Sequence, residues 1–283
     1  MFKPFKFAQN VGPSLGMIQY ALNNYWKFEN IKEHCNVLEV GCGPGNTTHD
    51  YLLGLFPKTL QTYIGIDKSK PMVEYAQKHY QNDPRLKFKL MDITTDSLPN
   101  NFLQAFDHVL SFQCLQFVSD HRKSLSNIYR MTKPGGNTFF TLPVRSVLFD
   151  VYEELAQNDI WKPYLKDYRK FLTPTQFFVD PQPQLHFETI LKEVGFSTVV
   201  CVSFDQNVVL PKKLFFAFVD SVCVYPIPKD LMDNFLEEVF EGMKRRKCVN
   251  DNNQDEQYVT TPCNFLIAYA IKPHLNSLAA NSL

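Results

Sequence analysis

Residues 37–48 read VLEVGCGPGNTT, an apolar run followed by three alternating glycines and a string of small polar residues. The apolar run predicts a short strand, and residues 46–56 predict a helix that ends before Pro57. Glycine tolerates positive φ angles and lets a ligand come close to the backbone. A strand, a glycine turn and a helix in this order therefore predict a ligand site at the end of the strand.

The same order of strand and helix continues along the chain. Strands are expected at residues 62–66, 86–91, 106–112 and 137–142, with helices at 71–80 and 120–131 between them. Alternation of this kind favours parallel pairing with right-handed crossovers. We therefore expect an α/β fold with a doubly wound, Rossmann-like sheet that is mostly parallel and whose last strand is antiparallel.

After residue 145 the composition changes, and aromatic residues become frequent. We expect one domain over residues 1–283, with a core made of residues 31–145, 183–206 and 264–271. Residues 146–182 and 207–250 are expected to be helical insertions that form a lid over an apolar acceptor cavity. The alternative is that their aromatic residues only form the core of the inserted helices.

Composition limits the classes of partner. Lysine plus arginine equals aspartate plus glutamate at 29 each, so no net charge attracts nucleic acid. No stretch reaches the roughly 18 apolar residues of a membrane span, and no signal peptide is apparent. The seven cysteines show no zinc spacing, so we expect no metal and a cytoplasmic location. The oligomeric state is left open.

Polar residues stand at the ends of the first four predicted strands. They are Glu39, Asp67, Asp92 and Ser111. Ligands of open α/β sheets bind beyond these strand ends, so the four residues together indicate one extended polar ligand. Asp67 follows the glycine turn by about 20 residues, where a carboxylate can accept both hydroxyls of a ribose.

The spacing of the glycines bears on the type of nucleoside. A dinucleotide site favours G-x-G-x-x-G, whereas this chain has Asn46 at the last glycine position. A sulfonium nucleoside with an amino-acid tail has no phosphate, and Glu39 could favour its positive charge indirectly. A nicotinamide-dependent oxidoreductase is kept as an alternative.

These motifs resemble the class I S-adenosylmethionine-dependent methyltransferases. Within that family, residues 106–136 and 149–171 are similar to the arthropod juvenile hormone acid O-methyltransferases. The resemblance implies S-adenosyl-L-methionine as the cofactor and an isoprenoid or fatty acid, such as farnesoic or juvenile hormone acid, as the methyl acceptor. It further implies that the following residues surround the donor: Gly41, Gly43, Asp67, Asp92 and Ile93, with Asp67 at the ribose and Asp92 and Ile93 at the adenine.

The chain departs from the insect members at the residues that position the acceptor carboxylate. It has Gln116 and Phe117 where they have His-Trp, and their N-terminal glutamine is displaced to Gln19. We expect Gln19, Gln116 and Phe117 to contact the acceptor. These departures also motivate a second hypothesis, a protein that binds an apolar ligand without catalysis.

The chemistry of the acceptor decides whether a general base is needed. A carboxylic acid has a pKa around 4 and is already ionised at pH 7. Its methylation therefore depends on positioning and on exclusion of water. His121 is the candidate base if the acceptor is instead an amine or a hydroxyl, as in a methyltransferase of different specificity.

Overall fold

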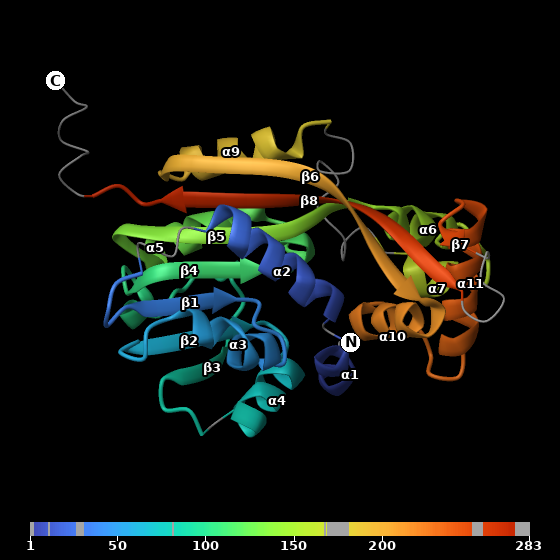
Figure 1. Ribbon diagram of the computed structural model, residues 1–283, viewed down its shortest axis with the longest axis horizontal. Coiled ribbons are helices and arrows are strands. Elements are labelled where there is room, and N and C mark those ends of the chain that lie inside the picture. The colour runs from blue at the N-terminus through green and yellow to red at the C-terminus, as the bar shows by residue number, and fades with distance from the viewer. Residues whose placement is uncertain are drawn as a thin grey trace.

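The computed structural model describes residues 3–10, 12–26, 31–80, 82–166, 168, 181–250 and 257–274. One sheet organises the fold, with the strand order β3-β2-β1-β4-β5-β8-β6 and β7 paired to β8 (Figure 1). The strands are β1 (Asn36–Val40), β2 (Thr62–Asp67), β3 (Leu86–Leu90), β4 (Phe106–Phe112), β5 (Thr132–Ser146), β6 (Ser197–Pro211), β7 (Val249–Asn250) and β8 (Tyr258–Ile271).

The first five strands pair in parallel, and β8 runs antiparallel to both β5 and β6. The order of the strands reverses direction between β1 and β4, where a ligand site is expected. The predicted fold class is confirmed, including the antiparallel last strand.

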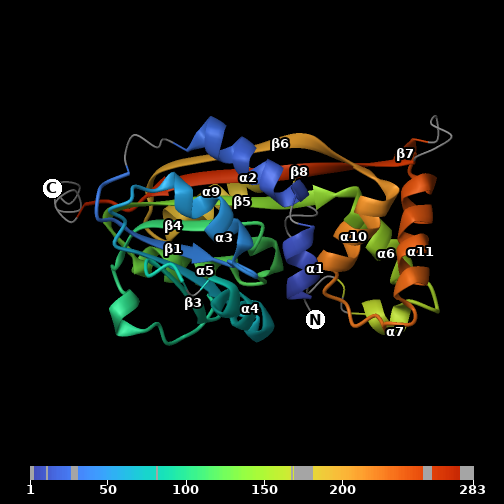
Figure 2. The same ribbon diagram turned by 60° about the horizontal axis from the view of Figure 1, so that its bottom comes forward.

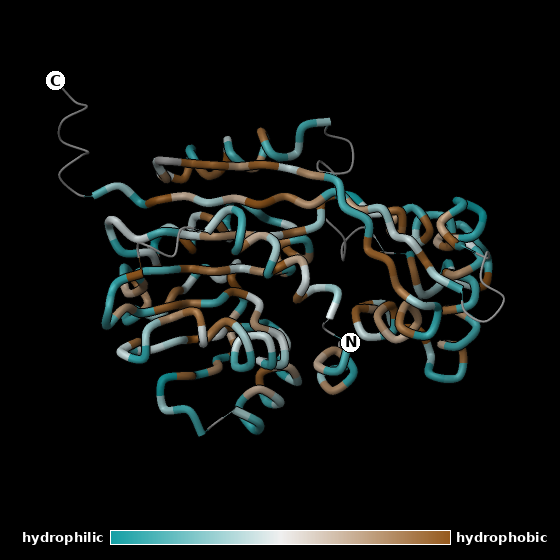
Figure 3. The backbone as a smooth tube through the Cα atoms, in the orientation of Figure 1, coloured by the Kyte–Doolittle hydropathy of each residue, from teal (hydrophilic) through white to brown (hydrophobic). Residues whose placement is uncertain are grey.

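Helices cover both faces of the sheet (Figure 2). One face packs against α2 (Gly12–Tyr25), α3 (Asn46–Asp50), the 3-10 helix η2 (Leu52–Leu55) and α4 (Lys70–Tyr80). The other face packs against α5 (His121–Met131) and α9 (Pro183–Glu193). In Figure 3 the central strands are largely hydrophobic along their length, as a sheet buried on both faces requires.

A group of helices, called the lid below, stands beyond the carboxyl end of β5. It contains α6 (Val147–Leu155), α7 (Lys162–Leu165), α10 (Lys212–Val222) and α11 (Met232–Arg245), and α1 (Pro4–Gln9) lies beside it (Figure 1). Trp161, Phe215, Phe235 and Phe240 are fully or nearly fully buried in a core of its own. Many aromatic residues of the two insertions therefore pack within the lid. Residues 169–180, which were expected to belong to the first insertion, lie outside the described residues.

Three strands are longer than the sequence indicates. The strand expected over residues 137–142 is β5, which spans Thr132–Ser146. The strand expected to begin at residue 264 begins at Tyr258, and residues 207–211, assigned above to the lid, belong to β6. These residues continue the antiparallel pairing of β6 with β8 past the ends of the parallel strands, and Val208 pairs there with Thr261. The polar residues 205–207 interrupt the local apolar pattern, but the backbone ladder with β8 holds them in the strand.

The ends of several helices also differ from the expected ones. The predicted helix over residues 46–56 divides into α3 and η2. The sequence did not indicate α1. Across the described residues, no helix has the length and hydropathy needed to cross a membrane.

Candidate active site

The glycine turn after β1 packs tightly against the loop that follows β4. Gly41 has φ of 80°, and a Cβ atom at this position would lie 2.2 Å from the Cys114 Sγ. The Gly41 amide donates to the Ile66 carbonyl at 2.7 Å, which joins the turn to the end of β2. A side chain at Gly41 would collide with Cys114, so the turn keeps its shape because the residue is glycine.

Asp67, at the end of β2, is fixed by this turn. Its Oδ2 accepts from the Gly43 amide at 3.0 Å, and its Oδ1 accepts from the Ser69 amide at 2.7 Å. Burial raises the pKa of Asp67, and the two backbone hydrogen bonds oppose that rise. A carboxylate offers about four lone-pair sites, so both oxygens keep capacity for a further donor, such as a ribose hydroxyl.

These strand ends surround a cavity, here called the donor cavity, with about 660 Å³ of empty space, part of it open to solvent. Five of the predicted cofactor residues line it. The described residues that line it are Phe7, Val40, Gly41, Gly43, Asp67, Lys68, Met72, Met91, Asp92, Ile93, Gln113, Cys114, Phe117 and Val118.

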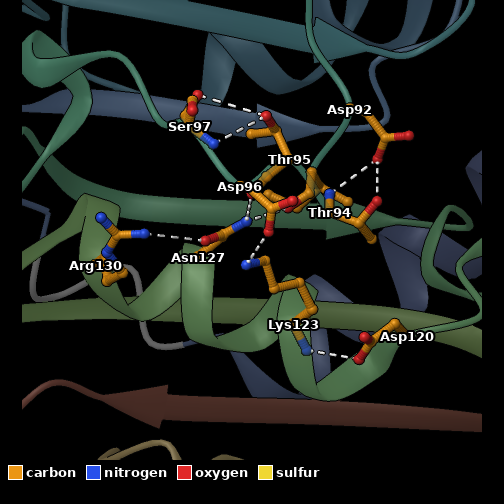
Figure 4. A network of polar contacts seen from close by, with 10 residues as sticks. Asp92, Thr94, Thr95, Asp96, Ser97, Asp120, Lys123, Asn127 and Arg130 are labelled. Atoms are coloured by element: carbon orange, nitrogen blue, oxygen red, sulfur yellow. Dashed lines mark hydrogen bonds and ion pairs between the residues drawn. The ribbon is translucent and has the colours of Figure 1, made fainter.

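The loop after β3 is held in place by α5. Asp92 accepts at Oδ1 from the Thr94 amide and hydroxyl at 2.8 and 2.7 Å (Figure 4). The Asn127 Nδ2 of α5 donates to the carbonyls of Ile93 and Thr95, both at 2.8 Å. Asp92 and the buried Ile93 are therefore presented to the donor cavity in a fixed orientation.

Two predicted cofactor residues lie beneath the donor cavity rather than in its lining. Glu39 is buried and accepts from the Thr48 hydroxyl at 2.7 Å and the Tyr63 hydroxyl at 3.1 Å. Burial raises the pKa of Glu39 to about 7. Ser111 donates to the Val40 carbonyl at 3.0 Å. Both side chains support the strand ends from below.

A second cavity, here called the acceptor cavity, lies between the sheet and the lid, with about 880 Å³ of empty space, part of it open to solvent. Among the described residues that line it, none is charged, and most are apolar. They are Phe7, Pro13, Ser14, Met17, Gln113, Gln116, Phe117, Pro143, Ser146, Leu148, Phe149, Val208, Leu210, Phe218, Val222, Thr261, Cys263 and Phe265. Phe7, Gln113 and Phe117 line both cavities, so the two cavities meet there.

Two of the three predicted acceptor residues line the acceptor cavity. Gln116 is buried, and its Nε2 donates to the Gln113 carbonyl at 2.8 Å. The Gln116 Oε1 is buried and has no hydrogen-bond partner in the described part of the chain. Gln19 is half-buried on α2 and lines neither cavity. The residues of α2 that line the acceptor cavity include Ser14 and Met17 instead.

Gln113 is a site residue that the sequence analysis missed. It follows β4 directly and has a positive φ of 50°, which is uncommon outside glycine. Its amide donates to the Thr141 carbonyl at 2.8 Å, and its Nε2 donates to the Thr141 Oγ1 at 3.3 Å. Its position directly after a central parallel strand indicates a ligand-site residue, by the same argument that indicated Asp67.

His121 lies in neither lining. It is buried at the start of α5, where its Nε2 lies 2.8 Å from the Leu115 carbonyl oxygen. Burial lowers the pKa of His121 to about 4, so the ring is neutral at pH 7. Among the described residues, Gln113 brings an amide to the junction of the cavities, whereas His121, the candidate base for an amine or hydroxyl acceptor, does not reach it.

Comparisons with known proteins identify the family. A methyltransferase domain model matches residues 38–140. The juvenile hormone acid O-methyltransferase of Drosophila melanogaster is 31% identical over 247 residues, which cover 83% of this chain and 80% of that protein. The chain belongs to this family of class I S-adenosylmethionine-dependent methyltransferases. The juvenile hormone acid O-methyltransferase of Bombyx mori is 29% identical, and the match covers 84% of this chain and 88% of that protein.

Solved structures show the same fold. The YcgJ protein of Bacillus subtilis has a TM-score of 0.60 at 18% identity and covers 92% of this chain and 98% of its own. A phosphoethanolamine N-methyltransferase 2 of Haemonchus contortus, solved with S-adenosyl-L-methionine, has a TM-score of 0.58 at 19% identity over 96% of this chain and 57% of its own.

S-adenosyl-L-methionine is the cofactor of the methyltransferase, which removes the nicotinamide alternative. The donor cavity fits it, since it combines a bare glycine turn, the fixed carboxylate of Asp67 and apolar walls from Met72 and Ile93. When bound, this cofactor supplies an electrophilic methyl group on a positively charged sulfonium.

Two ion pairs and a hydrogen bond hold α1 over the junction of the cavities. Lys3 and Lys6 form ion pairs with Asp220 of α10. On its other side, the Ala8 carbonyl accepts from the Asn46 Nδ2 at 3.3 Å, next to the glycine turn. The Phe7 ring of α1 thereby covers the donor and acceptor cavities together.

Proposed function

We propose that the methyltransferase esterifies the carboxylate of an apolar isoprenoid or fatty acid, such as farnesoic or juvenile hormone acid. The observation that carries this proposal is the meeting of an apolar cavity with the donor cavity at Phe7, Gln113 and Phe117. An apolar chain in the acceptor cavity would direct its carboxylate to this junction. The names of the insect relatives agree with an acid acceptor.

The side chains at the junction suit an acceptor that is already ionised. Moving a carboxylate out of water costs free energy unless donors replace its hydration. Gln113 lines both cavities, and Gln116 lines the acceptor cavity. An amide nitrogen carries two donor hydrogens, so each keeps one beyond its bond to Thr141 or to the Gln113 carbonyl. In this proposal the two glutamines hold the carboxylate and Phe117 excludes water from the junction.

The proposal assigns roles to the donor cavity as well. Asp67 accepts from the ribose hydroxyls, Asp92 and Ile93 contact the adenine, and Gly41 and Gly43 let the cofactor approach the backbone. Glu39 and Ser111 hold these groups from below through their hydrogen bonds to Tyr63, Thr48 and Val40.

Methyl transfer to a panel of acids tests the proposal. The protein is incubated with cofactor carrying a labelled methyl group and with farnesoic acid, juvenile hormone acid or medium-chain fatty acids. We expect a methyl ester from at least one of these acids, and no methylation of the matching alcohols. If calorimetry shows cofactor binding but no acid yields an ester, the non-catalytic hypothesis is favoured instead.

A cytoplasmic location is part of the proposal. All seven cysteines lie in described segments and are free thiols, as is usual in reducing compartments. Cell fractionation with an antibody to the protein tests the location, and recovery in a secreted or membrane fraction would contradict it.

A further inference from the structure

The far wall of the acceptor cavity is shared with a third cavity. This outer cavity has about 680 Å³ of empty space, part of it open to solvent. It is lined by Arg145, Ser146, Val147, Asp150, Asp205, Gln206, Asn207, Pro262, Cys263 and Asn264. Ser146 and Cys263 line both this cavity and the acceptor cavity. These two residues form a partition between them, here called the Ser146–Cys263 partition.

The partition separates two different environments. The outer cavity carries charged and amide groups, including Asp205, whose Oδ1 accepts from the Asn264 Nδ2 at 2.8 Å. The acceptor cavity is mainly apolar on its side of the partition. An apolar chain therefore gains burial up to the partition and would meet polar groups beyond it.

The partition is thin. Ser146 and Cys263 are neighbours across the antiparallel pair of β5 and β8, and the Cys263 thiol donates to the Ser146 Oγ at 3.3 Å. The same Ser146 oxygen accepts from the Leu148 amide at 3.3 Å and so caps α6. Cys263 has no such second role among these hydrogen bonds, and it is therefore the residue to vary.

The partition lies well away from the junction with the donor cavity. Gln113 is hydrogen-bonded to Thr141 of β5, and Ser146 follows Thr141 by five residues along the same strand. At about 3.3 Å per residue, this corresponds to roughly 16 Å along β5. That span suits the extended chain of a medium-length acid.

We infer that the Ser146–Cys263 partition is the distal wall of the acceptor cavity and sets the longest acid that the enzyme accepts, with Cys263 as the determinant of chain length. The inference rests on the proposed function, since it assumes that the carboxylate lies at Gln113 and Gln116. It adds that acids which extend past Cys263 are rejected because their apolar end would enter the outer cavity.

A series of straight-chain acids of increasing length tests the inference on the full-length protein. The values of kcat/KM are measured for the wild type and for Cys263→Ala, Cys263→Leu and Val209→Phe. Val209 is 54% exposed on β6 and lines neither cavity, so it controls for a change in this part of the sheet. Titration of the same acids into protein saturated with S-adenosylhomocysteine gives their affinities without turnover.

We expect the longest accepted acid to become longer in Cys263→Ala and shorter in Cys263→Leu. One methylene in an apolar pocket changes kcat/KM by about 10- to 200-fold, so the ratio between long and short acids should shift by at least about tenfold in each direction. The Val209→Phe variant should keep the length profile of the wild type.

The two proposals fail in different ways. If the wild type esterifies acids but both Cys263 variants keep its length profile, or lose all lengths equally, the inference is wrong and the proposed function stands. If acids bind with a length limit that moves in the Cys263 variants but no ester forms, the inference stands and the proposed function is wrong. If the wild type binds no acid, both are wrong.

Discussion

The donor cavity and the acceptor cavity share three residues, yet different parts of the chain build them. Residues at the ends of neighbouring parallel strands make most of the donor cavity, and backbone amides fix them, as at Asp67. The acceptor cavity draws on segments as distant in sequence as α1, β5, α10 and β8. Recognition of the donor therefore depends on a local motif, whereas recognition of the acceptor depends on how distant segments pack.

The largest effect is expected at the glycine turn of the donor cavity. In Gly41→Val a branched residue would have to adopt a φ of 80°, and its Cβ would lie 2.2 Å from the Cys114 Sγ. The strain and the overpacking together should weaken cofactor binding on the order of 100-fold. Calorimetric titration with the cofactor measures this loss. Gly16→Ala is the control, since a Cβ at Gly16 has no atom within 4 Å, and near wild-type affinity in Gly41→Val would contradict the tight packing.

The second effect concerns pH and belongs to the donor side as well. Because burial raises the pKa of Glu39 from 4.5 to about 7, ionisation of this residue opposes folding. Its neutral form contributes fully below about pH 4.5, and that contribution is lost as the pH rises through about 7, a change on the order of 3 kcal/mol.

Urea unfolding at a series of pH values measures this contribution. The free energy of unfolding of the wild type should fall relative to that of Glu39→Gln between about pH 4.5 and 7. The exposed variant Glu33→Gln is the control, and it should follow the wild type. Parallel curves for the wild type and Glu39→Gln would show that Glu39 stays ionised when buried.

A third test addresses Asp67. In Asp67→Asn the charged acceptor is lost, and hydrogen bonds to charged groups are worth about 1.5–3 kcal/mol. We expect cofactor affinity to fall by about 10- to 100-fold. The melting temperature should fall as well, because asparagine keeps only one of the two oxygens that accept from the Gly43 and Ser69 amides. Asp230→Asn, at an exposed position in the lid, should bind the cofactor as the wild type does. An unchanged affinity in Asp67→Asn would remove the ribose assignment.

The smallest effect separates the two cavities. Gln116 lines the acceptor cavity alone, so Gln116→Leu should lower kcat/KM for the acid by about tenfold, the lower end of the value of a hydrogen bond to a charged group. Cofactor affinity should stay within about twofold. Gln157→Leu, at an exposed position, controls for the added apolar side chain. If cofactor affinity falls as much as kcat/KM does, the two sites are not separable at Gln116.

The sequence predicted the fold and the donor cavity well because both depend on local order. Alternating strands and helices required a doubly wound sheet, and the strand ends required that Gly41, Asp67 and Asp92 meet. The same argument assigned Glu39 and Ser111 to the cofactor site, Glu39 by an indirect effect. In the structure neither side chain is in the lining of the donor cavity, since the sequence shows that a residue ends a strand but not which way its side chain points.

The acceptor cavity was much less predictable. Residues such as Leu210 and Phe265 line it, yet their types are those of ordinary core positions. Val208 and Leu210 reach the cavity only because β6 continues past residue 206, which depends on pairing with β8. Gln19 illustrates the converse, since the polarity of a helix residue does not show whether it faces a cavity or solvent.

The position of α1 has a practical consequence for producing the protein. Lys3, Lys6 and Ala8 tie this short helix to both α10 and Asn46, and Phe7 lies over both cavities. An affinity tag fused to the N-terminus would join the chain directly at this cover and could pull it from its place. The last described strand, β8, instead ends at Ile271 opposite Asn137, at the end of the sheet away from the cavities. Purification tags for enzymatic assays therefore belong at the C-terminus.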